Sequence, residues 1–321
     1  MSFSSDVKEE LSRQYGHARH CQIAELAAIF STCGSVMLSA QDEFSMRIST
    51  ENVGVAQKAY KLCKIAFEIT PEITIRPFVK FGRNKVYILL IRNAKSAERI
   101  LKAFRILKAD GALAENLMVD DLVVQQTCCK RAYIRGTFLT CGSFSDPTKH
   151  YHCEIVCQSE EKAVQIRDMI NSFEGIDAKI VPRKNSFVVY LKEGTQIVEL
   201  LNVMEGHKAL MELENVRILK EMRNHVNRQV NCEAANLNKT AVTAAKQIKD
   251  IELIRDTVGL SSLPENLEEL AYVRLEYPEA PLKDLGQYLA SPIGKSGVNH
   301  RLKKISEIAD GLRNARGGKE E

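Results

Sequence analysis

The chain repeats itself, and this duplication constrains the fold more than any other feature of the sequence. Residues 26–34 (LAAIFSTCG) and 134–142 (IRGTFLTCG) align without gaps at an offset of 108 residues, and a serine follows each. A repeat of this kind indicates a duplicated structural unit. Each nonapeptide is predicted to end a helix, because glycine is common at helix C-termini. The small residues Ala27, Ala28 and Gly136 would let two such helices pack closely.

The pattern of helices and strands repeats as well. Alternating apolar residues with β-branched or aromatic side chains predict strands, and apolar residues spaced i, i+3, i+4 predict helices. Each unit, including its nonapeptide helix, is predicted to be αββαββα, so two copies give two four-stranded sheets backed by helices. The predicted strands are 44–50, 73–81 and 86–91, then 151–157, 179–181 and 187–191; the predicted helices are 53–67 and 94–107, then 160–173 and 196–204.

The nonapeptide resembles the LAGLIDADG motif of homing endonucleases. The resemblance implies that the two motif helices pack at a pseudo-twofold axis, and that the two sheets form a saddle over the DNA major groove. It also implies that the acid before each terminal glycine binds Mg²⁺. Here Cys33 and Cys141 occupy those two positions. Because Mg²⁺ prefers oxygen ligands and thiols suit softer metals, we expect degenerate metal positions, no catalytic residue and no nuclease activity.

The nine cysteines have no spacing typical of a disulfide framework, so we expect reduced thiols. The closest pairs are Cys128–Cys129 and Cys153/Cys157, and neither has a second pair or a histidine at zinc-finger spacing. We therefore expect small buried side chains, no metal site and no cofactor. A redox pair formed by Cys33 and Cys141 is the alternative at the motif positions.

Basic residues gather in the predicted hairpin of the first repeat and in an asparagine-rich run at 223–239. Such side chains can contact DNA phosphates, which adds affinity without sequence information. The alternatives are a solvated cationic face or a protein-binding surface for the hairpin, and an inter-domain helix with capping and turn asparagines for the run, with Thr240 as a possible N-cap of a new helix. The candidate phosphate contacts are Arg76, Lys80, Arg83, Lys85, Arg223, Arg228 and Lys239.

The last sixty residues are predicted to form a helix-turn-helix. A helix at 282–289 and a turn at 290–295 precede a helix at 297–310, which Ser296 would cap. Val298, Leu302, Ile305, Ala309 and Leu312 form an apolar face, and the opposite face is polar and basic, as a DNA-recognition helix requires. A three-helix scaffold with a solvated basic face is the alternative. The candidate DNA contacts are Lys295, Ser296, Asn299, His300, Arg301, Lys303 and Lys304.

Taken together, a LAGLIDADG duplication without acids, the connector VNRQVNCEAANLNKT and the terminal helix-turn-helix resemble the WhiA family of Gram-positive bacteria. The resemblance implies a regulator that binds double-stranded DNA in cell division, chromosome segregation and, in spore-formers, sporulation. An active endonuclease, or an adaptor that binds a protein through its repeat domain, is the alternative.

The predicted fold class is α+β. A net charge of only +4 does not by itself indicate nucleic acid. With no secretory signal or membrane span in the sequence, we expect a cytoplasmic, nucleoid-associated protein. The expected domains are 1–20 (helical), 21–207 (repeats 21–108 and 129–207), 208–258 (helical connector) and 259–321 (helix-turn-helix).

Overall fold

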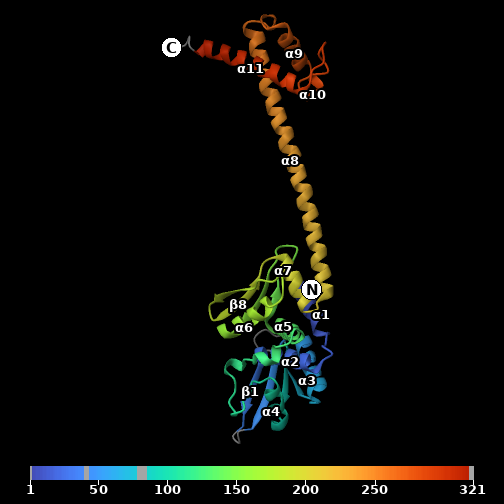
Figure 1. Ribbon diagram of the computed structural model, residues 1–321, viewed down its shortest axis with the longest axis vertical. Coiled ribbons are helices and arrows are strands. Elements are labelled where there is room, and N and C mark those ends of the chain that lie inside the picture. Colours follow the sequence, from blue (N-terminus) through green and yellow to red (C-terminus); the bar gives the residue numbers. More distant parts are fainter. Residues whose placement is uncertain (1, 40–42, 78–84, 318–321) are drawn as a thin grey trace. The chain divides into compact units, whose positions relative to one another are not determined.

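The computed structural model describes residues 2–39, 43–77 and 85–317. The chain divides into two compact units, Met1–Lys220 and Glu221–Glu321. Helix α8 (His207–Thr257) begins in the first unit and continues into the second (Figure 1).

The first unit contains both repeats, and each has the predicted αββαββα order. The sheets have the same topology, β1-β2-β4-β3 and β5-β6-β8-β7, with antiparallel pairing throughout the described strands. The α+β duplication is confirmed. Its elements are α2 (Arg19–Cys33), β1 (Gly34–Leu38), β2 (Phe44–Thr50), α3 (Val53–Phe67), β3 (Glu72–Pro77), β4 (Lys85–Ile91), α4 (Ala94–Ala103), α5 (Thr127–Cys141), β5 (Gly142–Phe144), β6 (Cys153–Cys157), α6 (Glu160–Asn171), β7 (Lys179–Arg183), β8 (Ser186–Leu191) and α7 (Gly194–Val203).

Shorter elements complete this unit. Helix α1 (Phe3–Ser12) precedes the first repeat, and the 3₁₀ turns η1 (Glu115–Leu117) and η2 (Asp121–Val124) lie between the repeats. Phe3, Val7 and Leu11 of α1 are buried in the same core as both repeats. The N-terminal helix is therefore part of the repeat unit.

The motif glycines end their helices as predicted, but not in a left-handed conformation. Gly34 and Gly142 are extended, with φ of −94° and −87°, so neither provides a left-handed helix cap. A Cβ atom at Gly34 would lie 2.3 Å from the Phe30 ring, and one at Gly142 would lie 2.2 Å from the Phe138 ring. Glycine is required at both positions, because the backbone passes closely over a buried phenylalanine where the helix leads directly into a strand. The predicted order includes this strand, which is β1 in the first repeat and β5 in the second, but the sequence pattern did not define its residues.

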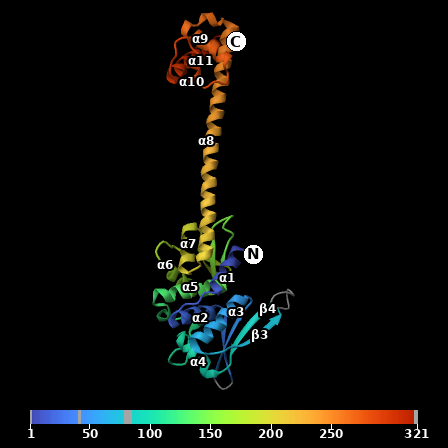
Figure 2. The same ribbon diagram turned by 90° about the vertical axis from the view of Figure 1, so that its right-hand side faces the viewer.

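Helices α2 and α5 pack side by side between the two sheets (Figures 1 and 2). The contact is tightest at Gly136, where a Cβ atom would lie 2.6 Å from the Glu25 carbonyl oxygen and 2.9 Å from the Ala28 Cβ. Ala27 and Ala28 are fully buried. The predicted close approach of small residues is confirmed, and it leaves no room for a larger side chain at Gly136.

A buried network of charges joins the two repeats beside this contact. Glu25 of α2 accepts from Lys58 Nζ of α3 at 2.6 Å and from Arg135 Nε of α5 at 2.8 Å. Arg135 also pairs with Glu205 at 2.6 Å, and Lys58 donates to the Leu11 carbonyl oxygen at 2.6 Å. Burial lowers the pKa of Lys58 to about 8, against the opposing effect of Glu25. Glu25 is thus the shared counter-charge of two buried cations.

The second unit is all-helical. After α8 come a 3₁₀ turn η3 (Leu260–Ser262), α9 (Glu265–Glu276), α10 (Leu282–Leu285) and α11 (Lys295–Gly317). The prediction that Thr240 caps a new helix is wrong, because α8 continues through it and the Thr240 hydroxyl donates to the Asn236 carbonyl oxygen at 2.9 Å. For the same reason, the asparagines of the connector do not form caps or turns.

We predict that Gly136→Ala lowers the free energy of unfolding by about 1–3 kcal/mol, since overpacking a close helix contact forces the backbones apart. Gly311→Ala is the matched control. Gly311 lies in α11 with nothing within 4 Å of its Cβ position, so alanine there should stabilise by about 0.5–1 kcal/mol. Urea unfolding followed by far-ultraviolet circular dichroism measures both; equal effects would contradict the steric explanation.

We also predict that Glu25→Gln lowers the free energy of unfolding by about 3–5 kcal/mol, because it leaves the buried Lys58 without a carboxylate partner and Arg135 with Glu205 alone. Glu72→Gln is the control, since the Glu72–Arg92 pair is exposed and such pairs contribute at most about 1 kcal/mol. The same unfolding measurement applies. A loss from Glu25→Gln as small as that of the control would show that the network carries little stability.

Candidate nucleic-acid interface

Helix α11 has the predicted division into an apolar and a polar face. Val298, Leu302, Ile305 and Ala309 are buried, and Leu312 packs against the same core. This core also takes residues from α8, α9 and α10, including Ile251, Leu270 and Leu285. Hydrophobic burial therefore fixes which side of α11 faces outward.

The segment before α11 differs from the prediction. The α-helix ends at Leu285 instead of continuing to residue 289, because the chain folds back so closely that a Cβ atom at Gly286 would lie 2.2 Å from the Ile293 carbonyl oxygen. The Ile293 amide donates to the Gly286 carbonyl oxygen at 3.0 Å. Helix α11 begins at Lys295, so Ser296 lies inside the first turn and is not the N-cap. The result is a closed turn longer than that of most helix-turn-helix motifs.

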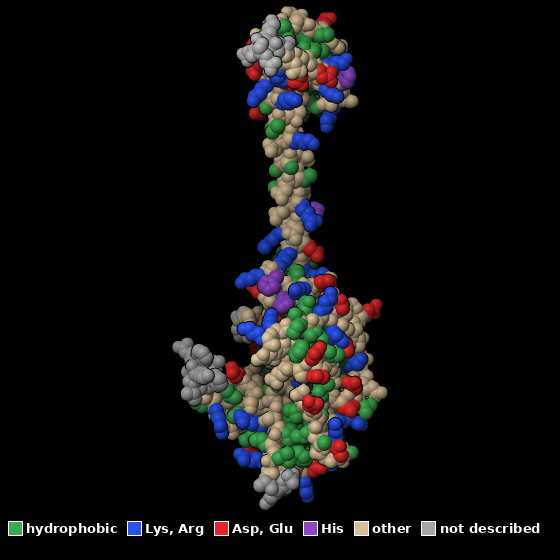
Figure 3. Space-filling model, turned by 90° about the vertical axis from the view of Figure 1, so that its left-hand side faces the viewer, with side chains coloured by type: hydrophobic (Ala, Val, Ile, Leu, Met, Phe, Trp, Pro, Cys, Tyr) green, Lys and Arg blue, Asp and Glu red, His purple; other side chains and the backbone are tan. Residues whose placement is uncertain are grey.

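Most of the predicted DNA contacts lie on the exposed side of α11. Lys295, Ser296, Asn299, His300, Lys303 and Lys304 are exposed. Arg301 is different: it is half-buried at the edge of the apolar face, and its Nη1 donates to the Asn266 carbonyl oxygen of α9 at 3.2 Å. Figure 3 shows Lys and Arg side chains and a histidine on the visible face of this unit. Arg301 thus helps to hold α11 against α9, whereas the other six side chains face solvent.

Polar contacts hold α11 and its turn in place. Arg313 of α11 pairs with Asp250, a fully buried residue of α8, and with Asp310 at 2.6 Å. Glu269 of α9 accepts from the Ala290 amide in the turn at 2.6 Å. Because these contacts anchor both the turn and the far end of α11, the exposed side chains are presented from a rigid support.

Of the basic residues predicted in the hairpin of the first repeat, the structure describes Arg76 and Lys85. Lys80 and Arg83 lie outside the described residues. Arg76 pairs with Val86 and Lys85 pairs with Pro77, so Arg76 and Lys85 lie on opposite faces of the sheet. Arg47 of β2, which the hairpin alone does not indicate, lines the same depression as Arg76. A search by strand alternation across all strands, rather than within one hairpin, would have found it.

The three candidate phosphate contacts of the connector are exposed. Arg223, Arg228 and Lys239 are exposed on α8, as are Asn224, Asn227 and Asn231. They lie on one uninterrupted helix.

The two motif positions lie together at the C-terminal ends of α2 and α5. The Thr32 hydroxyl donates to the Thr140 hydroxyl at 2.8 Å across the pseudo-twofold axis. The Cys33 and Cys141 thiols donate to carbonyl oxygens one turn earlier, at 3.1 and 3.2 Å, and burial raises the pKa of Cys33 to about 12. Both are free thiols. The ammonium group of Lys162 bonds the Ser31 carbonyl oxygen at the same place.

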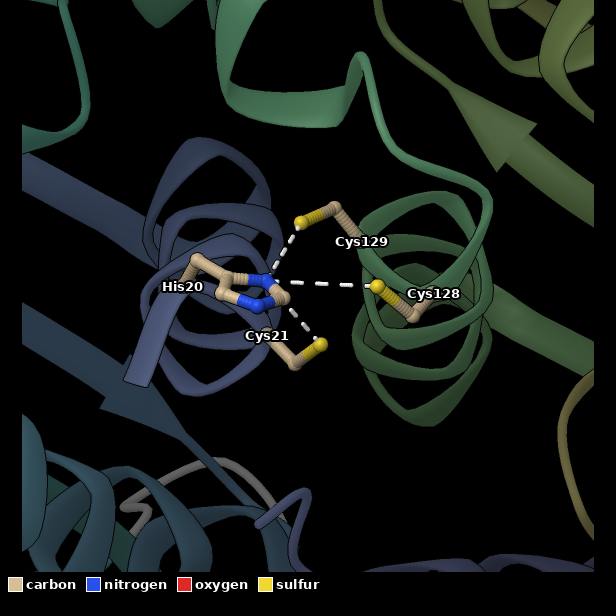
Figure 4. A group of neighbouring side chains, drawn as sticks. All are labelled: His20, Cys21, Cys128 and Cys129. Atoms are coloured by element: carbon tan, nitrogen blue, oxygen red, sulfur yellow. Dashed lines mark hydrogen bonds between the residues drawn. The ribbon is translucent and has the colours of Figure 1, made fainter. Parts of the chain in front are cut away.

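A second group of residues lies at the opposite, N-terminal ends of these helices. His20 and Cys21 of α2 meet Cys128 and Cys129 of α5, and their potential ligand atoms all lie within 4.8 Å of one another (Figure 4). The expectation that the cysteines are buried is wrong for Cys128, which is exposed, as it is for Cys232. No local spacing in the sequence indicates this group, because its two pairs lie far apart along the chain. The repeat offset of 108 residues would have aligned Cys128–Cys129 with His20–Cys21.

Known proteins share this order of two repeats and a C-terminal helical unit. Family models of the WhiA N-terminal LAGLIDADG-like domain, the WhiA LAGLIDADG-like domain and the WhiA C-terminal HTH domain match residues 19–107, 130–223 and 226–309. "Probable cell division protein WhiA" of Lachnoclostridium phytofermentans is 54% identical, over 98% of this chain and 100% of its own length. The chain belongs to the WhiA family.

Two further relatives agree with this assignment. The WhiA protein of Alkaliphilus oremlandii, also named a probable cell division protein, is 50% identical over 97% of this chain and 98% of its own length. The crystal structure of full-length WhiA from Thermatoga maritima is 27% identical, with a TM-score of 0.59, covering 97% of this chain and 98% of that one. Among the described residues of the present chain, no helix is long and apolar enough to cross a membrane.

Proposed function

We propose that this WhiA family member binds double-stranded DNA in a sequence-specific manner and regulates transcription in cell division and chromosome segregation, and sporulation in spore-formers. The observation that carries the proposal is the rigid α11, whose exposed face presents Asn299, His300 and Lys303 opposite a buried apolar face. A recognition helix needs this division, because its first turns must reach base edges while its inner face is packed. The names of the relatives support the role in cell division. Such a role requires a location at the chromosome.

The side chains on α11 divide by chemistry. Asn299 and His300 can hydrogen-bond base edges, and an asparagine amide can pair with adenine through two hydrogen bonds. Lys295, Lys303 and Lys304 suit the flanking phosphates, as does Ser296. Arg301 is assigned to positioning α11, because its guanidinium already donates to the backbone of α9.

The repeat unit is proposed to act without cleaving DNA. Cleavage by two metal ions needs carboxylates that hold the ions at the scissile phosphate. In their place this chain has the thiols of Cys33 and Cys141 and the ammonium group of Lys162, which would repel Mg²⁺. Arg47 and Arg76 remain available for phosphate contacts on the first sheet. A protein partner on this unit is the alternative use.

We predict that His300→Ala weakens binding to a specific site by about 1–3 kcal/mol while changing affinity for random DNA little. Lys303→Ala should weaken binding to both DNAs similarly, because a phosphate contact carries no sequence information. It should also reduce the slope of the logarithm of the binding constant against the logarithm of the salt concentration by about one. Fluorescence anisotropy at several salt concentrations measures both, with sites taken from genome-wide mapping of the bound protein.

The control for these variants is Lys208→Ala, which changes an exposed lysine in the repeat unit. It should leave specific affinity unchanged. Specific binding that survives deletion of residues 260–321 would refute the assignment of recognition to the C-terminal unit.

We predict no cleavage of duplex DNA by the full chain with Mg²⁺ or Mn²⁺, whatever the target. The assay incubates the protein with a duplex that carries its mapped site and resolves the products on a denaturing gel. Cleavage that disappears in the Cys33→Ser/Cys141→Ser double variant would establish a nuclease and overturn this part of the proposal.

A further inference from the structure

The group His20, Cys21, Cys128 and Cys129 is not used by the proposed DNA-binding role. It combines three thiols with one imidazole, and these side chains point toward one another from the two motif helices (Figure 4). The His20 Nδ1 atom lies 3.1 Å from the Cys129 Sγ, 3.3 Å from the Cys21 Sγ and 4.0 Å from the Cys128 Sγ. One nitrogen atom therefore faces three sulfur atoms from two helices.

These distances suit a tetrahedral metal centre. With zinc–sulfur bonds of about 2.3 Å and zinc–nitrogen bonds of about 2.0–2.1 Å, the ligand atoms of a tetrahedral site are about 3.6–3.8 Å apart. The observed separations lie around these values, and none exceeds 4.8 Å. Small shifts of side chains would bring all four atoms to bonding distance. A set of three cysteines and one histidine is also a common ligand set for structural zinc.

The helix N-terminal positions of these residues offset part of the cost of burying thiolates, the form that binds metal. Each pair lies in the first turn of its helix, α2 or α5, where the positive end of the helix dipole stabilises negative charge. Within these two described helices, neither N-cap residue, Ala18 or Gln126, makes a side-chain capping bond.

We propose that His20, Cys21, Cys128 and Cys129 bind one Zn²⁺ ion as a closed structural site that clamps the first turns of α2 and α5 together. Three thiols lose their protons on binding, and the neutral imidazole donates through Nδ1. Four protein ligands leave no open position for substrate, so the ion serves the structure and not catalysis. Because Cys21 and Cys129 are buried while His20 and Cys128 are exposed, the ion enters from the His20 and Cys128 side.

The test uses the full-length chain, purified under reducing conditions without added metal. Elemental analysis should find about one zinc per chain. After the zinc is removed with a chelator, Co²⁺ should produce the visible absorption of a tetrahedral site with thiolate ligands, and Zn²⁺ should displace it. Cys128→Ser and His20→Ala should each lower zinc affinity by more than about 100-fold, since even residues beyond the direct ligands are worth 10–100-fold. Both positions are exposed, so circular dichroism should remain unchanged.

Cys232→Ser is the matched control, because Cys232 is an exposed thiol on α8 that belongs to the other unit. It should keep the zinc content and the Co²⁺ spectrum of the unaltered chain. Zinc content near zero in the unaltered chain that Zn²⁺ does not restore, or equal binding by the Cys128→Ser and Cys232→Ser variants, would overturn the proposal. So would mass spectrometry that finds a Cys21–Cys129 disulfide in the reduced preparation.

Discussion

The close approach of α2 and α5 at Gly136 is the contact on which the repeat unit depends. Each helix belongs to a different repeat, and each carries one sheet beside it (Figure 1). Gly136 lets the backbones meet, and the Glu25 network then shares one carboxylate between cations of α3 and α5. The positions of the sheets, the motif cysteines and the His20 group all follow from this contact.

The same helix pair has different chemistry at its two ends. At the C-terminal ends, where the helix dipole is negative and homing endonucleases place metal-binding acids, neutral thiols and Lys162 are found. At the N-terminal ends, where the dipole is positive, thiols gather around His20. The helix pair therefore carries thiols and an ammonium group at one end, and a set of ligands suited to a softer cation at the other.

The sequence predicted the architecture well, because the repeat and the alternation of apolar residues are local patterns. It predicted the apolar face of α11 for the same reason. It failed where the cause was a distant contact, since the helix that ends at Leu285 depends on the approach of Ile293. It also failed where residues had to be compared between repeats, as with His20 and Cys128. Which exposed side chains of α11 contact bases is still a prediction.

The charge network around Glu25 has a consequence for how the sequence can change over generations. Its members lie on α2, α3 and α5 and at Glu205 after α7, and each is held by at least one other member. Replacing Glu25 alone leaves the buried Lys58 without a carboxylate partner, whereas replacing the whole network with apolar residues need cost little. The route between these two states passes through unstable intermediates. We therefore expect strong epistasis among these positions, which should vary together or not at all within lineages that share this fold.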